Sequence, residues 1–196
     1  MLILASTSPR RKEILSFFKI PFHIMSPNFD ELSIPYELDP IAYVKKIAEG
    51  KAEAINKLHL GMPVLAADTI VVKKNKLYLK PSNLDEAMIM LKELCGHQHQ
   101  VLTATTMQHQ NTSKTIVTST NVEFHAYNEK EIQNYINSVP ILDKSGSYAI
   151  QGIGSLIVKK IEGCFYNVMG LPISSVSTLL KEFGFDIWDH LKIYSH

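Results

Sequence analysis

Apolar residues recur along this chain with the two periods that distinguish strands from helices. Residues 2–5 and most of 64–72 are continuously apolar, which is typical of short strands buried on both faces. Between these runs, apolar side chains recur at the spacing of one helix face, at Ile41, Val44, Ala48, Ala52 and Ile55. Because buried strands alternate with amphipathic helices, the sequence predicts an α/β fold.

Capping signals and β-rich runs predict the remaining elements. N-cap residues and first-turn prolines predict helix starts at Ser8-Pro9, Asp39-Pro40, Ser82 with Asp85, Asn128 with Glu131, and Pro172. Further strands are expected over residues 22–25, 77–79, 101–108, 115–124 and 155–161. The resulting order, β-α-β-α-β-β-α-β-β-α-β-α, is that of a mixed β-sheet flanked by helices.

Composition narrows the class of protein. The chain has 196 residues, of which 45% are hydrophobic and 20% charged, as in an ordinary globular domain. Neither a linker nor an internal repeat divides it, so residues 1–196 are predicted to form a single domain. A net charge of +1 and the lack of an aromatic and basic platform argue against a nucleic-acid partner.

The apolar runs also argue against a membrane partner, since none reaches the ~20 residues that cross a bilayer. At the N-terminus the apolar residues 1–5 precede the basic residues 10–12, which reverses the order of a secretory signal. Cys95 and Cys164 stand far apart and are expected to be free thiols in a reducing compartment. A cytoplasmic location is therefore expected.

Two arginines stand where a helix dipole disfavours them. Residues 6–11 join the first strand to the first predicted helix, whose N-terminus presents free N–H groups and positive partial charge. Arg10 and Arg11 each cost a few tenths to ~1 kcal/mol there, a penalty that reverses when a polyphosphate binds at the same corner. Ser8 and the two arginines therefore favour a phosphate-binding turn, with a solvated basic turn as the alternative.

Charged residues also interrupt two apolar patterns. Lys51 falls on the apolar face of the helix predicted after Asp39, and Asp68 lies within the strand 64–72. A buried carboxylate needs a cationic partner, and such carboxylates concentrate at functional sites. Lys80 follows the hairpin and can approach the same end of the sheet. The alternatives are that Lys51 reaches solvent along its helix and that Lys80 is an exposed lysine at a strand end.

Two loops carry further candidate ligands. Asp30 and Glu31 begin an acidic loop whose carboxylates suit a hard cation with oxygen ligands, although a solvated loop is the alternative. Residues 143–152 combine charge, glycines and the amide of Gln151, which is typical of a binding loop.

Together these features resemble the Maf-like nucleoside triphosphate pyrophosphatases over nearly the whole chain. The segments that carry the resemblance are Ala5-Ser6-Thr7-Ser8-Pro9-Arg10-Arg11, Asp30-Glu31, Lys51-Ala52, Ala67-Asp68-Thr69, Lys80-Pro81, Gly96, His99-x-Val101-x-Thr103, 143–152 and Gly170-Leu171-Pro172. Ser145 stands where alanine is usual, a departure outside the expected chemical roles. The resemblance implies two lobes around a central cleft, as in the Maf and inosine triphosphatase folds.

The resemblance also implies an activity, the metal-dependent hydrolysis of nucleoside triphosphates to monophosphate and pyrophosphate. Asp68 would be the general base, and Glu31 with Asp68 would hold Mg²⁺ or Mn²⁺. The groups that would offset phosphate charge are Ser8, Arg10, Arg11, Lys51 and Lys80. Nucleoside triphosphates are the expected partners, and the resemblance leaves both a monomer and a homodimer possible.

Base selectivity is assigned by the resemblance to Arg10, Thr69 and Gln151. The branch with these three residues prefers dTTP and UTP, whereas a second branch with tryptophan, glutamine and glutamate prefers 7-methylguanosine triphosphate. The amide of Gln151 matches the O4 acceptor and N3–H donor of uracil or thymine, which favours the first branch. A regulatory module that binds nucleotide without turnover is the alternative from another class, and Asp68 argues against it, because without a metal a carboxylate hinders triphosphate binding.

Overall fold

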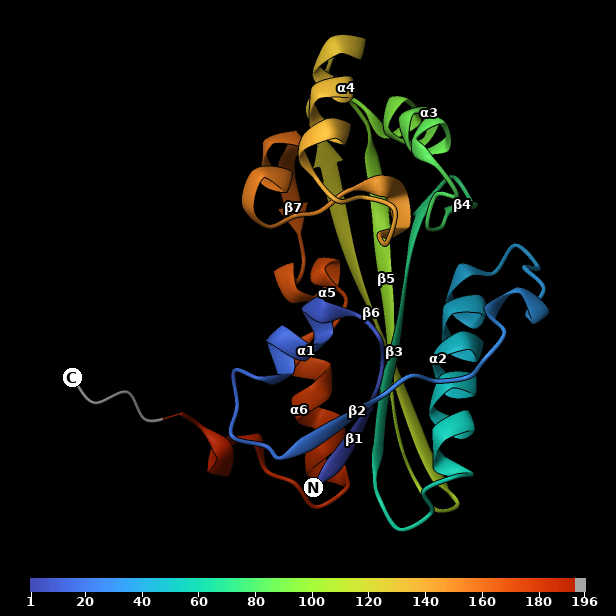
Figure 1. The fold of residues 1–196 in the computed structure, drawn as a ribbon, viewed down its shortest axis with the longest axis vertical. Coiled ribbons are helices and arrows are strands. Elements are labelled where there is room, and N and C mark those ends of the chain that lie inside the picture. The colour runs from blue at the N-terminus through green and yellow to red at the C-terminus, as the bar shows by residue number, and fades with distance from the viewer. Residues whose placement is uncertain (193–196) are drawn as a thin grey trace.

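A mixed sheet of seven strands runs the length of the molecule (Figure 1). The computed structural model describes residues 1–192 and gives the sheet order β2-β1-β3-β5-β6-β7, with β4 paired to β3. The strands are β1 (Leu2–Ala5), β2 (Phe22–Met25), β3 (Val64–Lys73), β4 (Lys76–Tyr78), β5 (Gln98–His109), β6 (Thr112–Phe124) and β7 (Val158–Glu162). The strands β1, β2 and β3 are parallel to one another and the other pairs are antiparallel, so the predicted mixed sheet is confirmed.

Helices cover both faces of this sheet (Figure 1). They are α1 (Pro9–Leu15), α2 (Pro40–Asn56), α3 (Leu84–Leu94), α4 (Glu129–Ser138), α5 (Phe165–Met169) and α6 (Ile173–Glu182). The long helix α2 lies on one face of β3 and β5, whereas α1, α5 and α6 lie on the opposite face. The pair α3 and α4 packs at the other end of the sheet. No helix within residues 1–192 is long and apolar enough to cross a membrane.

The two largest of the clusters that make up the hydrophobic core lie at the two ends of the sheet, which form the two lobes. At one end Leu91 of α3, Ile136 of α4 and Phe124 of β6 are buried together. At the other end Leu4 of β1 packs in a cluster with Leu179 of α6. Because β5 and β6 are long enough to contribute to both clusters, the lobes share one sheet rather than a linker.

The structure corrects the predicted strand over residues 155–161. Residues Gly152–Ile157 form a 3-10 turn instead, and strand β7 begins only at Val158. The turn is tight, since a Cβ on Gly154 would lie 2.4 Å from the carbonyl oxygen of Ala149. A period-2 apolar pattern cannot reveal such a close backbone approach, because it depends on packing between distant segments.

Three smaller differences concern helices. The cap of α3 is Asn83 rather than Ser82, since the Asn83 side chain accepts from the backbone N–H of Glu86. Ile41, expected on the buried face of α2, is 55% exposed in the first turn of that helix. The short helix α5 was not predicted, because its five residues are too few for a periodic pattern.

Candidate active site

A notch in the edge of the sheet lies where the two lobes meet. The parallel neighbour β1 pairs with β3 only over residues 64–66, and the antiparallel neighbour β4 pairs with it only over residues 71–73. Residues 67–70 of β3 therefore have no strand partner on this side. Asp68 and Thr69 stand in this gap, on consecutive positions that point to opposite faces of the sheet.

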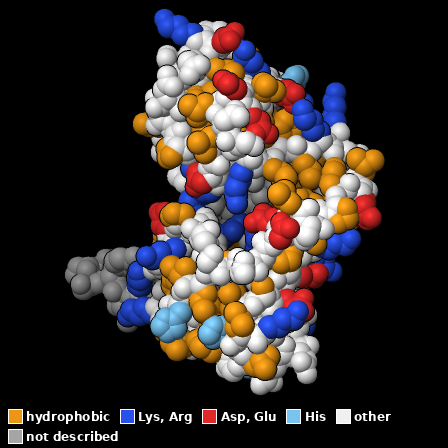
Figure 2. Space-filling model, turned by 45° about the vertical axis from the view of Figure 1, so that its right-hand side comes forward, with side chains coloured by type: hydrophobic (Ala, Val, Ile, Leu, Met, Phe, Trp, Pro, Cys, Tyr) orange, Lys and Arg blue, Asp and Glu red, His pale blue; other side chains and the backbone are white. Residues whose placement is uncertain are grey.

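Apart from Asp30, whose carboxylate accepts from the backbone N–H of Leu32, the side chains singled out from the sequence line one cleft at this notch, which Figure 2 shows as a hollow between the two lobes. They are Ser8, Arg10, Arg11, Glu31, Lys51, Asp68, Thr69, Lys80 and Gln151. They come from six separate segments, so only the tertiary fold brings them together. The cleft has a carboxylate pair beside α2 and a basic side beside α1.

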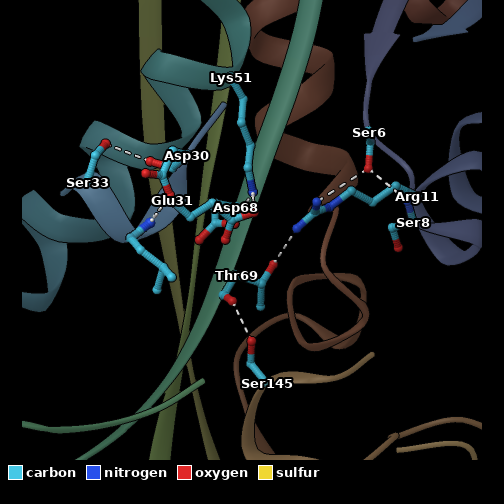
Figure 3. Close-up of polar contacts among 11 residues, drawn as sticks. Ser6, Ser8, Arg11, Asp30, Glu31, Ser33, Lys51, Asp68, Thr69 and Ser145 are labelled. Carbon is cyan, nitrogen blue, oxygen red and sulfur yellow. Dashed lines mark hydrogen bonds and ion pairs between the residues drawn. The ribbon is translucent and has the colours of Figure 1, made fainter. Parts of the chain in front are cut away.

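Lys51 bridges the two carboxylates of the cleft (Figure 3). It extends from α2 with only 6% of its surface exposed, and its Nζ lies 2.6 Å from Asp68 Oδ1 and 2.8 Å from Glu31 Oε1. The lysine therefore meets buried anions and does not reach solvent along its helix. Asp68, also 6% exposed, has the cationic partner that its burial requires.

The charge of Glu31 depends on this lysine. Burial is the largest single influence and disfavours the ionised acid, but the nearby cations, chiefly Lys51, together outweigh it and hold the pKa of Glu31 below its ordinary value of 4.5. Lys80 and Arg11 contribute to the same lowering of the pKa. Glu31 is therefore an anion at neutral pH, and the ammonium of Lys51 lies between its side chain and that of Asp68.

The donor set for a divalent cation is limited to these carboxylates. Across residues 1–192, no group of three or more His, Cys, Asp and Glu side chains could hold a metal ion. The ammonium of Lys51 occupies Oδ1 of Asp68 and Oε1 of Glu31, while their second oxygens accept no hydrogen bond from the described residues. Two hard oxygens fit Mg²⁺ or Mn²⁺ only where water and substrate phosphates supply the other ligands.

Arg11 faces the notch from the opposite side of β3 (Figure 3). Its Nε donates to the carbonyl of Gly170 at 2.7 Å, and its terminal nitrogens lie 3.1 Å from Thr69 Oγ1 and 3.4 Å from Ser6 Oγ. Burial lowers the pKa of Arg11, and the negative charge of Asp68 opposes that shift. Gly170 has a φ of 104°, and a Cβ there would lie 3.2 Å from Thr69 Oγ1, so glycine allows this close approach.

Arg10 and Ser8 behave differently from the sequence-based expectation. Arg10 forms an ion pair with Asp143 at 2.9 Å, and Ser8 makes no side-chain cap of α1. Both guanidinium groups therefore already have partners in the protein: Asp143 for Arg10, and the acceptors described above for Arg11. The arginines are therefore not left uncompensated at the helix N-terminus, although both still line the cleft.

The segment 143–151 is fastened to the notch by contacts that sequence reasoning missed. Ser145 Oγ donates to the backbone carbonyl of Thr69 at 2.8 Å (Figure 3), so its hydroxyl has a role that alanine could not fill. The hydroxyl of Tyr148 lies 2.9 Å from Nε2 of His99. Burial lowers the pKa of His99 to about 3, so this buried ring is neutral at pH 7. The side-chain oxygen of Gln151 is buried without a partner among the described residues.

Comparison with known proteins shows the family to which this chain belongs. The family model described as Maf-like protein matches residues 1–183. This chain belongs to the Maf-like family. A dTTP/UTP pyrophosphatase of Chlamydia caviae is 46% identical over 191 residues, and one of Chlamydia felis is 44% identical, with 97% of each chain covered in both comparisons. The structure of the Ham1 protein of Staphylococcus aureus superposes on 63% of this Maf-like chain and over 71% of the Ham1 chain, with a TM-score of 0.44 and 16% sequence identity.

Replacing Lys51 tests the electrostatic role of the bridge in this Maf-like chain. Lys51→Met leaves a buried carboxylate without its cation, so we expect the free energy of unfolding at pH 7 to fall by about 3 kcal/mol. The lowered pKa of Glu31 stabilises the wild-type fold at pH values above 4.5, and this contribution is lost as the acid becomes protonated at lower pH. The difference in unfolding free energy between wild type and variant should therefore narrow below pH 4.5. Urea unfolding across this pH range measures both effects.

Lys45→Met is the matched control. Lys45 lies on the same helix, is 50% exposed and sits 3.8 Å from Glu49, so its loss should change stability by less than about 0.5 kcal/mol. Equal losses from the two variants would contradict the bridging role of Lys51.

Proposed function

We propose that this chain is a metal-dependent nucleoside triphosphate pyrophosphatase that prefers dTTP and UTP, releasing nucleoside monophosphate and pyrophosphate. The observation that carries the proposal is the cleft itself, in which a carboxylate pair and a set of basic groups face each other across the notch in β3. Its relatives from Chlamydia caviae and Chlamydia felis are named dTTP/UTP pyrophosphatases, and they cover nearly the whole chain.

Asp68 is the proposed general base. Lys51 holds one of its oxygens, which fixes the plane of the carboxylate, and the other oxygen has no protein donor among the described residues. That free oxygen can take the proton of a water molecule as the water attacks the α-phosphorus. A bond then forms between the water oxygen and this phosphorus, the bond to the bridging oxygen of the β-phosphate breaks, and pyrophosphate leaves with the electron pair.

The basic side of the cleft is proposed to stabilise this leaving group. Arg11 is held rigidly by its contacts with the protein, and it faces the cleft as a fixed positive charge. Lys80, which is exposed at the cleft edge, and the hydroxyl of Ser8 can bind the same phosphates. Positive charge placed in advance where negative charge develops is the largest contribution that a protein makes to phosphoryl transfer.

Glu31 and Asp68 are proposed to hold the divalent cation: Glu31 would bind it through the oxygen that Lys51 does not use, and Asp68, whose free oxygen takes the water proton, would hold it through that water. Mg²⁺ or Mn²⁺ bound there would neutralise charge on the triphosphate and polarise it toward attack. Two protein carboxylates are a usual number for a Mg²⁺ ion whose remaining ligands are water and substrate phosphate oxygens.

A panel of substrates tests the proposed activity and preference. With Mg²⁺ or Mn²⁺ present, kcat/KM should be highest for UTP and dTTP and lower for ATP, GTP and 7-methyl-GTP, with pyrophosphate as product and no turnover in excess chelator. The reason for the preference is that Arg10 repels the positive 7-methylguanine, while the Gln151 amide complements uracil and thymine. Nucleotide binding without pyrophosphate release would identify a regulatory module instead, and faster hydrolysis of 7-methyl-GTP would contradict the base assignment.

Asp68→Asn tests the proposed base. The amide keeps the shape of the side chain and can still accept from Lys51, but it cannot take the water proton, so kcat should fall about 10²-fold or more. The matched control is Asp85→Asn, an exposed position in the first turn of α3, which should leave kcat unchanged. If a folded Asp68→Asn protein keeps more than half of the rate, another group is the base.

A further inference from the structure

A chain of hydrogen bonds leaves the cleft at Thr69 and continues into the protein interior. The guanidinium of Arg11 donates to Thr69 Oγ1 at 3.1 Å, and Thr69 Oγ1 lies 2.9 Å from Thr103 Oγ1. Thr103 Oγ1 in turn donates to the backbone carbonyl of Asn167 at 3.0 Å. Thr69 and Thr103 are direct partners in the pairing of β3 with β5, and Thr103 is fully buried.

Asn167, at the interior end of this series of hydrogen bonds, is held by further contacts. Asn167, on α5, is fully buried and donates through Nδ2 to the Val101 carbonyl and to Thr120 Oγ1, each at 2.9 Å. These contacts fix α5 against β5 and β6. The Asn167 carbonyl is thereby held in place as an acceptor beneath Thr103.

The number of hydrogens on each group determines which group donates in each of these hydrogen bonds. A threonine hydroxyl has one hydrogen and two acceptor positions, whereas a backbone carbonyl only accepts and an arginine only donates. If Thr103 donates to Asn167 and Thr69 donates to Thr103, all three bonds form together. If Thr103 donated to Thr69 instead, the bond to Asn167 would be lost. The favoured direction therefore runs from Arg11 through both threonines to Asn167.

This direction leaves Thr69 with one free position, and that position is a lone pair. Its hydrogen is committed to Thr103, and one of its two acceptor positions receives Arg11. Since Thr69 lines the cleft and Thr103 does not, a buried residue sets the hydrogen-bonding character of a surface that a substrate can touch.

We propose that Thr103 is a positioning residue for base selection, because it makes Thr69 solely an acceptor toward the cleft. An acceptor there favours a pyrimidine with a hydrogen on N3, as in uracil and thymine, over cytosine, whose N3 carries a lone pair. The inference rests on the proposed function and assigns the N3–H contact to Thr69, which leaves the Gln151 amide to donate to O4.

The same strand provides a matched control. Thr105 lies two residues farther along β5, is equally buried, and its Oγ1 has no hydrogen-bond partner among the described residues. Thr105→Val therefore removes a buried hydroxyl and leaves the hydrogen bonds from Arg11 to Asn167 intact. Thr103→Val removes the acceptor of the Thr69 hydrogen, which then becomes free to turn toward the cleft and donate to N3 of cytosine.

The test compares kcat/KM for UTP and CTP in the wild type and three variants. The UTP to CTP ratio should fall roughly fivefold in Thr103→Val, the factor expected for one net hydrogen bond, and stay at the wild-type value in Thr105→Val. Thr103→Ser keeps the hydroxyl and should retain the ratio. An unchanged or increased ratio in Thr103→Val, or the same loss in Thr105→Val, would overturn the proposal.

A substrate analogue gives a second test that needs only the wild-type protein. N3-methyl-UTP cannot donate from N3, so its kcat/KM should be roughly tenfold or more below that of 5-methyl-UTP, which carries the same methyl group elsewhere. Equal rates for the two analogues would overturn the proposal even if Thr103→Val does not fold. Failure of the wild type to release pyrophosphate from UTP would instead overturn the proposed function, and the inference with it.

Discussion

The arrangement of the cleft depends on one ammonium group. Lys51 Nζ is the partner of both Asp68 and Glu31, and it lies within hydrogen-bond distance of each. Two neighbouring carboxylates repel each other, and a cation between them offsets that repulsion. The lysine lowers the pKa of Glu31 and ties three segments together, namely α2, β3 and the loop after β2. It also determines which carboxylate oxygens remain free for water, metal or substrate.

The notch in the sheet explains why the chemistry is located on β3. Where β1 ends and β4 has not begun, Asp68 and Thr69 keep their places through β5 on one side only. Alternation along the strand then directs Asp68 to the face of α2 and Thr69 to the face of α5. One short stretch of backbone thus presents an anion to Lys51 and a hydroxyl to Arg11, and both belong to the same cleft.

Much of this arrangement could be predicted from sequence because it breaks local rules. A lysine on an apolar helix face and an aspartate in a buried strand each required a partner, and the structure makes them partners of each other. The contacts that were missed follow no local rule. The hydroxyls of Ser145 and Thr103 and the amide of Asn167 break no local pattern, and their roles arise from pairing across distances of 34 to 76 residues in the chain. Likewise, the start of β7 was misplaced because the contact between Gly154 and Ala149 leaves no mark in the apolar pattern.

The most direct test of the account is the position of the bond that breaks. Hydrolysis of UTP in ¹⁸O-labelled water, followed by mass spectrometry and ³¹P NMR, identifies both the products and the phosphorus that was attacked. Attack at the α-phosphorus by a water molecule activated by Asp68 predicts labelled UMP and unlabelled pyrophosphate. Label in pyrophosphate, or formation of UDP and orthophosphate, would contradict it.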